Sequence, residues 1–253
     1  MFNNAIVRRP AKSMVNGLTE ASLGVPDYDL ACAQHNDYIQ ALRECGLEVE
    51  ILDPIEDHPD SCFVEDVALI TPKCAVLTRP GAPSRQGEVE YMAPILANYF
   101  SSLERIEAPG TIEAGDIMMV GEHYYIGLSE RTNQAGAQQM IDILLTHGLT
   151  GSMVSMSEML HLKTGLSYLE NSNLLVCGEF TSKPEFAHLK RIEVPINESY
   201  SANSVWINDT VLVPSGFSST STAVANMGYA VREVAMSEFQ KLDGGLSCLS
   251  LRF

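Results

Sequence analysis

The strongest constraint on the fold of this chain is a short recurring pattern, in which two apolar segments are joined by a tight turn. Hairpins of this form start at Asp66, Asp116, Gly165 and Asn203, with separations of 50, 49 and 38 residues. The last residues, 247–253, have the character of a fifth start. A repeat at this spacing is typical of architectures in which each copy is one supersecondary unit.

Helical periodicity separates the hairpins, and a short strand-like segment follows several of the helical ones. Helices are expected over residues 27–45, 86–100, 132–147 and 219–227, and strands over residues 47–52, 152–156 and 229–234. The repeated unit is therefore strand, strand, helix, strand, and the fifth copy is expected to be split, with the C-terminal strand pairing with residues 4–8. This organisation predicts a five-bladed α/β propeller of ββαβ units with pseudo-five-fold symmetry. An ordinary open α/β sheet is the alternative that the same alternation permits.

Composition and charge limit the classes of partner. With 253 residues, of which 45% are hydrophobic, and no linker-like segment, residues 1–253 are expected to form a single catalytic domain. A net charge of −16 disfavours nucleic acid and favours a small cationic ligand. The sequence has no apolar run that would serve as a signal peptide or membrane span, so we expect no membrane association and a cytoplasmic protein. A monomer and a homodimer both fit the sequence.

Reactive side chains gather at the beginnings of the hairpins. They are Asp60, Glu65 and Asp66 before the first, Glu113 and Asp116 before the second, His161 before the third, and Cys248 in the last. If the units share an axis, these side chains point into one pocket, where the carboxylates would hold a guanidinium or ammonium ligand. Each carboxylate taken alone is more typical of a turn cap, and an isolated histidine among apolar neighbours is more typical of a core residue.

A cysteine, a histidine and a carboxylate form a set for nucleophilic catalysis, in which the histidine transfers protons and the carboxylate orients it. Cys248 follows the glycine-rich turn at residues 243–247, which leaves a thiol accessible. Most cysteines are small buried apolar residues, and Cys62, beside the acidic residues, fits either description. Arg85 and Arg131 are either solvated surface residues or ligands of a substrate carboxylate. The histidines have no metal-ligand spacing and no phosphate-binding glycine loop is present, so we expect no metal and no cofactor.

Five motifs in order resemble those of the dimethylarginine dimethylaminohydrolase family, which belongs to the guanidine-modifying superfamily known as penteins. The motifs span residues 63–66, 78–81, 112–116, 161–165 and 243–248, and the resemblance covers the whole chain. The family implies the five-fold ββαβ propeller and a hydrolase that converts asymmetric dimethylarginine or monomethylarginine to citrulline and dimethylamine or methylamine.

The resemblance also implies roles for individual residues. Cys248 matches the nucleophile, which forms a covalent thiouronium intermediate, His161 matches the general acid and base, and Glu113 matches its orienting carboxylate. The substrate-binding positions of the family match Asp60, Glu65 and Asp66 for cationic groups, Arg85 and Arg131 for the α-carboxylate, Leu18 in the flap and Leu242 beside the nucleophile. Because carboxylates raise the pKa of a nearby thiol, we expect the arriving cation to activate it.

Three other functions remain open at this stage. An arginine deiminase and an amidinotransferase would use the same Cys-His-carboxylate set, although the compact length disfavours the deiminase. A non-catalytic protein that binds cationic amino acids differs from both, because it would tolerate serine in place of Cys248.

Overall fold

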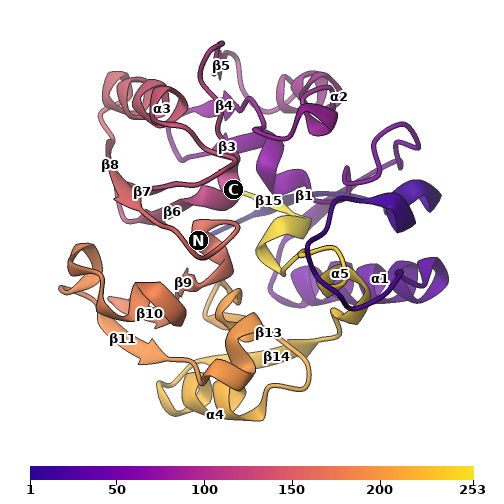
Figure 1. Ribbon diagram of the computed structural model, residues 1–253, viewed down its shortest axis with the longest axis vertical. Helices are drawn as coiled ribbons and strands as arrows, with labels where there is room; N and C mark the ends of the chain where they lie inside the picture. The colour runs from indigo at the N-terminus through magenta and orange to yellow at the C-terminus, as the bar shows by residue number, and fades with distance from the viewer. The chain divides into compact units, whose positions relative to one another are not determined.

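Fifteen strands form five separate three-stranded sheets in the computed structural model, which describes residues 1–253 (Figure 1). The sheets, in strand order, are β15-β1-β2, β3-β4-β5, β6-β7-β8, β11-β10-β9 and β12-β13-β14. Their strands are β1 (Asn4–Arg8), β2 (Glu48–Leu52), β3 (Ala68–Ile70), β4 (Ala75–Leu77), β5 (Leu103–Arg105), β6 (Ile117–Val120), β7 (His123–Leu128), β8 (Thr150–Ser155), β9 (Leu166–Tyr168), β10 (Asn173–Val176), β11 (Lys190–Glu193), β12 (Val205–Ile207), β13 (Thr210–Pro214), β14 (Ala230–Val234) and β15 (Leu251–Arg252). The alternative of one open sheet is therefore wrong.

Every sheet has the same topology, because the central strand pairs antiparallel with one neighbour and parallel with the other. Four of the parallel pairs are connected by an α-helix, as the ββαβ unit requires. The helices are α1 (Tyr28–Glu44), α2 (Glu88–Leu96), α3 (Gln134–Thr146), α4 (Ser218–Asn226) and the short α5 (Ser237–Gln240), which lies after β14. The predicted repeat is thus confirmed strand by strand.

The split fifth copy is also confirmed. β15 pairs antiparallel with β1, with Ile6 opposite Leu251, so that the two ends of the chain complete one sheet (Figure 1). The predicted helices are found within two residues of their bounds, except α2, which ends at Leu96 rather than at residue 100. Pro94 lies inside α2 and has no N–H to donate to the preceding turn, which weakens the helix near its C-terminus.

One unit lacks the helix. Between β10 and β11 the chain forms two 3-10 helices, η6 (Gly178–Ser182) and η7 (Pro184–Phe186). This connection is short and contains Pro184 in its middle, and this explains both the missing helix and the shorter sequence separation of this copy.

A 3-10 helix precedes the first strand of every unit, and at Asp66, at Asp116 and in residues 247–249 it occupies positions where the sequence pattern predicts that the strand has begun. These turns are η2 (Val64–Val67), η4 (Ala114–Asp116), η5 (Leu162–Thr164), η8 (Ile196–Ala202) and η9 (Ser247–Leu249). The predicted strand starts at Asp66 and Asp116 are therefore wrong by one or two residues. The physical reason is that buried polar side chains at these positions bond to backbone groups, and this favours a turn over a ladder.

The chain divides into two compact units. Unit 1 comprises Met1–Val64 and Gly165–Phe253, and unit 2 comprises Glu65–Thr164. Unit 1 has a core that includes Tyr38, Phe63 and Phe239, and unit 2 has a core that includes Tyr124 and Met140. None of the helices combines the length and the apolar composition that crossing a membrane requires.

Candidate active site

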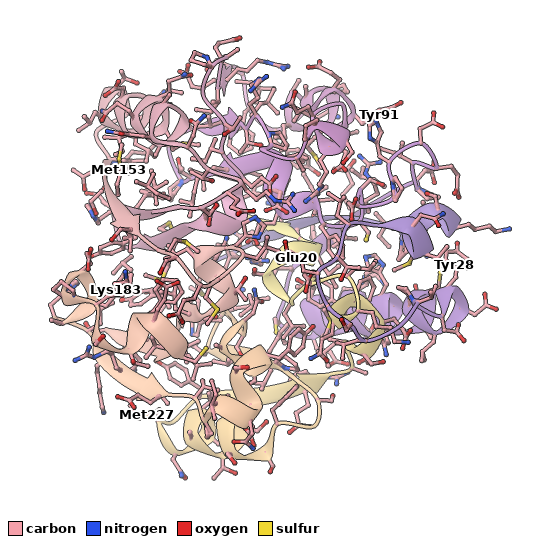
Figure 2. The ribbon with its side chains drawn as sticks, viewed as in Figure 1. Glu20, Tyr28, Tyr91, Met153, Lys183 and Met227 are labelled. Carbon is pink, nitrogen blue, oxygen red and sulfur yellow. The ribbon has the colours of Figure 1, made fainter.

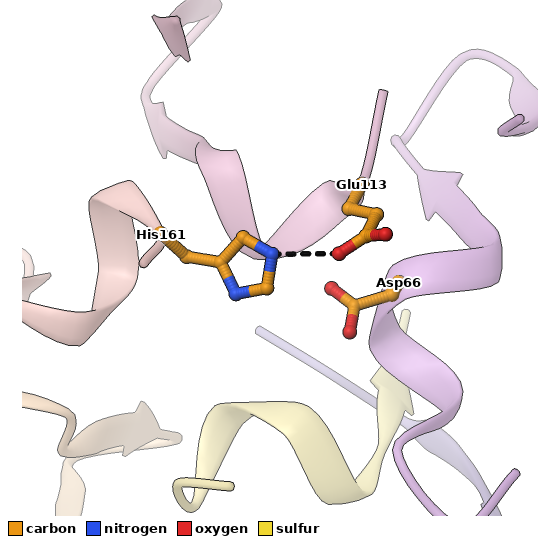
Figure 3. A group of neighbouring side chains, drawn as sticks. All are labelled: Asp66, Glu113 and His161. Atoms are coloured by element: carbon orange, nitrogen blue, oxygen red, sulfur yellow. Dashed lines mark hydrogen bonds and ion pairs between the residues drawn. The ribbon is translucent and has the colours of Figure 1, made fainter. Parts of the chain in front are cut away.

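Three of the predicted site residues meet in unit 2. Nε2 of His161 lies 2.7 Å from Oε2 of Glu113, and the carboxylate of Asp66 faces the same pair (Figure 3). Glu113 is fully buried and the His161 side chain is 12% exposed. Because Nε2 is engaged by Glu113, Nδ1 on the other side of the ring is the nitrogen available for proton transfer.

The turn that presents Glu113 is fixed by a close approach of backbone to side chain. Glu113 caps η4, and the N–H of Gly115 in that turn donates to Oδ1 of Asp66 at 2.9 Å. A Cβ at position 115 would lie 2.8 Å from that oxygen and 3.0 Å from Nδ1 of His161. Only glycine therefore allows the turn to pack directly against both side chains.

Asp116, at the end of the same turn, fixes the segment that carries the histidine. Its Oδ1 accepts from the N–H of Leu162 at 2.9 Å, and its Oδ2 accepts from the hydroxyls of Ser129 and Thr132, each at 2.6 Å. The backbone next to His161 is thus held by a buried carboxylate that the sequence pattern placed among the candidate ligands of a cation.

The charges in this cluster favour a protonated histidine. Burial opposes the charge on His161, but Asp66, Asp116 and Glu113 outweigh it and raise its pKa to about 9. Burial also opposes the charge on Glu113, yet the hydrogen bond from His161 and nearby cations hold the pKa of this carboxyl below its usual value. In Asp116 burial dominates and raises the pKa. At neutral pH the cluster therefore contains an imidazolium paired with a carboxylate, which is the state of a general acid.

Arg85 is surrounded by acidic partners. It is 5% exposed, and its guanidinium bonds both oxygens of Glu88, at 3.1 and 2.9 Å, and Oδ2 of Asp66 at 2.5 Å. Burial would lower the pKa of Arg85, but Glu88 and Asp66 raise it well above its usual value, so the side chain stays charged. Burial likewise opposes the charge on Asp66, but the positive charges of His161 and Arg85 outweigh it and lower the pKa of this carboxyl.

Arg131 and Glu65 complete the predicted residues of unit 2. The side chain of Arg131 is 21% exposed, with its Nη1 3.7 Å from Oε1 of Glu113. Oε1 of the buried Glu65 lies 2.5 Å from Nζ of Lys163. Sequence reasoning missed both Lys163 and Glu88. The i,i+3 spacing between Arg85 and Glu88 was a usable signal for the second, since residues three apart in a turn are neighbours.

The donor atoms of Asp66, Glu113 and His161 lie within 4.8 Å of one another, a separation that suits metal ligands as well. The direct hydrogen bond between His161 and Glu113 would have to break for an ion to sit between them. The described geometry is thus that of an acid-base pair.

The remaining predicted residues lie in unit 1. Oδ1 of Asp60 accepts from the N–H of Leu18 at 3.0 Å, and Leu242 is buried, with Cδ2 3.3 Å from the position of a Cβ on the neighbouring Gly17. Leu18 itself is 41% exposed. The structure therefore brings together the three substrate-binding residues predicted in this unit.

The segment after Leu18 is tied down by a second carboxylate. Glu20, labelled in Figure 2, donates its N–H to Oδ2 of Asp243 at 2.7 Å, and the hydroxyl of Thr19 donates to the same oxygen at 3.1 Å. Asp243 begins the glycine-rich turn that leads to Cys248.

Cys248 lies in η9 and is 9% exposed. The N–H of Gly245 points to its Sγ at 3.4 Å, and the N–H of Cys248 donates to the carbonyl of Gly245 at 3.2 Å. Cys62 is fully buried in the core of unit 1. A backbone N–H directed at sulfur stabilises a thiolate, and the N–H of Gly245 is such a group at Cys248.

The chain is similar in sequence to one protein family and to named enzymes from two bacteria. The arginine deiminase family matches residues 53–209. The N(G),N(G)-dimethylarginine dimethylaminohydrolase of Pseudomonas aeruginosa is 55% identical over 254 residues, which covers 100% of both chains. The enzyme of the same name from Streptomyces coelicolor is 33% identical over 250 residues, which covers 98% of this chain and 96% of that protein.

The solved structures that this chain resembles include one of the same Pseudomonas aeruginosa enzyme. The Pseudomonas aeruginosa enzyme, as a cysteine-to-serine mutant complexed with citrulline, matches with a TM-score of 0.99, 55% identity and full coverage of both chains. The N-terminal domain of the arginine dihydrolase ArgZ has a TM-score of 0.90 at 21% identity, covering 100% of this chain and 97% of that one, and shows the fold alone. Together with the five repeated sheets, these matches confirm the predicted five-bladed α/β propeller of ββαβ units. The chain belongs to the dimethylarginine dimethylaminohydrolase family of penteins.

Proposed function

We propose that Cys248 is the nucleophile of this hydrolase, that His161 is its acid and base, and that Glu113 orients His161. The family reaction converts N-omega-methylated arginine to citrulline and dimethylamine or methylamine, and the chain is an enzyme of this class. The observation that carries the assignment is the 2.7 Å contact between Glu113 and a histidine whose pKa is raised to about 9. Such a histidine is protonated before the leaving amine needs its proton.

The substrate is a small amino acid with a cation at one end and a zwitterion at the other. Glu65 and Asp66 are the proposed ligands of the guanidinium, and Asp60, with the backbone at Leu18 and Leu242, is the proposed ligand of the α-amino group. A carboxylate that accepts several N–H bonds holds a planar guanidinium in one orientation. Orientation matters here because the guanidinium carbon is a poor electrophile and gains most from correct placement against the thiolate.

Arg131 and Arg85 are the proposed partners of the α-carboxylate. Arg131 is partly exposed, so its guanidinium forms a fork with a ligand directly. Arg85 already bonds Glu88 and Asp66, so its contribution includes the positive charge that it maintains at the site.

The reaction proceeds in two halves. The Cys248 thiolate attacks the guanidinium carbon, a C–S bond forms, and the electron pair moves to nitrogen in a tetrahedral adduct. The C–N bond to dimethylamine then breaks, and His161 supplies the proton that the leaving amine requires. In the second half His161 deprotonates a water that attacks the thiouronium carbon, the C–S bond breaks, and citrulline leaves.

The test is an incubation of purified protein with asymmetric dimethylarginine and, separately, with arginine, in which citrulline, dimethylamine and ammonia are measured. Citrulline and dimethylamine from the methylated substrate, lost in Cys248→Ser and in His161→Gln, are the expected result. Ammonia from arginine would contradict the proposal and favour a deiminase. Citrulline formation that survives Cys248→Ser would also refute it.

The proposal extends to the assembly and the compartment of the protein. Residues 1–253 act as one catalytic domain, since the relatives match over their full length. A reducing cytoplasm suits a chain with a nucleophilic thiol in which none of the six cysteines forms a disulfide. Chromatography with light scattering distinguishes the monomer from the homodimer.

A further inference from the structure

Asn203 contacts the turn that carries Cys248, which we call the nucleophile turn (residues 243–248). It directly follows η8 and is 6% exposed. Its Oδ1 accepts from the N–H of Ser247 at 2.9 Å, and its Nδ2 donates to the Ser247 hydroxyl at 3.1 Å. The oxygen and the nitrogen of the Asn203 amide therefore both bond to Ser247, the residue directly before the cysteine.

The same amide packs against the glycine that faces the thiol. A Cβ at Gly245 would lie 2.4 Å from Cγ of Asn203, and the N–H of Gly245 points to Sγ of Cys248. Asn203 thus packs against Gly245 and bonds to Ser247, two residues of the nucleophile turn. A displacement of Asn203 would move the amide that faces the sulfur.

This contact has two counterparts in unit 2. Oδ1 of Asp66 accepts from Gly115 of the turn that presents Glu113, and Oδ1 of Asp116 accepts from Leu162, next to His161. The sequence separations are 49, 46 and 44 residues for the pairs that start at Asp66, Asp116 and Asn203. In each case a polar residue next to the first strand of one ββαβ unit holds a 3-10 turn further along the chain. A contact that recurs at equivalent positions beside Glu113, His161 and Cys248 belongs to the catalytic architecture.

The three positions differ in charge in a way that matches their neighbours. Two are aspartates, which stand beside a histidine that has to be cationic. The third is an asparagine, which contacts the turn of a cysteine that has to become an anion. A carboxylate there would oppose formation of the thiolate, whereas an amide holds the turn without adding negative charge.

We propose that Asn203 is the positioning residue of the nucleophile, and that it holds the turn of Cys248 through a side chain that must be uncharged. This inference rests on the proposed role of Cys248. The other titratable groups near the turn in unit 1 are Arg252, Tyr200 and Asp243. Nη1 of Arg252 donates to the carbonyl of Ser247 at 3.3 Å, the hydroxyl of Tyr200 donates to the carbonyl of Gly244 at 2.7 Å, and Asp243 accepts from Thr19 and Glu20. Burial followed by the charge of Cys248 raises the pKa of Tyr200 well above its usual value, so it stays neutral in the range tested.

The experiment compares Asn203→Ala and Asn203→Asp with the matched control Asn173→Ala. Asn173 is also 6% exposed and donates its amide to the hydroxyl of Tyr229, so its loss is a structural perturbation of similar kind. For Asn203→Ala we expect kcat to fall by about 10- to 100-fold, with KM changed by less than about threefold, because the nucleophile is misplaced. Asn173→Ala should keep both constants.

Asn203→Asp keeps the acceptor for the Ser247 N–H but adds a charge. The pH midpoint for alkylation of Cys248 by iodoacetamide, read by mass spectrometry of its peptide, should rise by about one unit. This readout needs no substrate, so it tests Asn203 even if no dimethylamine is released and the proposed function fails. The inference is overturned if folded Asn203→Ala retains kcat within threefold of wild type, if Asn173→Ala loses as much, or if the alkylation midpoint of Asn203→Asp equals that of wild type.

Discussion

The state of His161 gives the sharpest prediction, because Glu113, one of the three carboxylates that raise its pKa, can be neutralised without removing the hydrogen bond. Glu113→Gln removes a negative charge 2.7 Å from Nε2 but keeps an amide oxygen that accepts the same hydrogen bond. The imidazole should therefore keep its orientation while its pKa falls from about 9. The perturbation separates charge from geometry.

The magnitude follows from the distance. Two unit charges about 4 Å apart interact by about 4 kcal/mol at an effective dielectric constant of about 20, a value that applies to sites of this kind. At about 1.36 kcal/mol per pKa unit this interaction is worth about 3 units, and it is an upper bound because Asp66 and Asp116 are the larger causes of the raised pKa. We expect a decrease of about 1 to 3 units, since opposite charges at this distance shift pKa values by that amount.

The assay is a titration of the His161 ring by NMR, with the resonance assigned through His161→Gln, together with the pH dependence of kcat. Because protonated His161 supplies the proton to the amine, the alkaline limb of the profile should move to lower pH along with the NMR midpoint. Glu122→Gln is the matched control, since Glu122 lies in the same unit with its side chain 74% exposed. A midpoint that moves by less than about half a unit in Glu113→Gln would refute the electrostatic reasoning.

Three further perturbations follow from the same geometry. His35 is buried with no hydrogen-bond partner for either ring nitrogen, and burial lowers its pKa from 6.5 to about 4. The free energy of unfolding should therefore lose about 3 kcal/mol as the pH falls from 6.5 toward 4, where only the unfolded state takes up the proton. Urea titrations of His35→Leu should lack this component, and an unchanged pH dependence would contradict it. Gly115→Ala forces a methyl group against Asp66 and His161, so kcat should fall by about 10- to 100-fold in a protein with a wild-type melting transition, and normal turnover would count against the close packing. Arg131→Lys removes a bidentate fork and should raise KM by about tenfold with little change in kcat, whereas an unchanged KM would exclude Arg131 as a carboxylate ligand.

The sequence predicted the fold well because the repeat carries much of the information. Alternation of period two and helical periodicity identified the strands and helices, and glycines at the ends of helices marked their termini, as at Gly46 and Gly148. The 3-10 turns before the strands were not predictable in this way. Three of the five, η4, η5 and η9, are held by side-chain contacts over 44 to 49 residues, which no local pattern records.

The contacts between the site residues were likewise not predictable from local sequence patterns. Residue types identified Glu113 and His161 as candidates, and the family motifs assigned their roles, but only coordinates show that Nε2 of His161 faces Glu113. The pairing of Glu65 with Lys163 spans 98 residues and has no sequence signature. The sequence therefore offered candidate residues but could not predict which of them would neutralise one another.

The pairing of acidic residues with cationic side chains changes the role that we assign to the acidic residues. Buried carboxylates interrupting apolar segments were interpreted as requiring a cationic ligand, yet in unit 2 Glu65 is paired with Lys163, Glu88 with Arg85 and Glu113 with His161. A guanidinium that reaches these carboxylates shares acceptors that already have cationic partners, so its charge alone contributes less to affinity than an unpaired site would provide. Binding must then depend on contacts at both ends of the substrate. The main contribution of the carboxylates near His161 is to keep this side chain protonated. Discrimination among guanidines would accordingly come from orientation rather than from net charge.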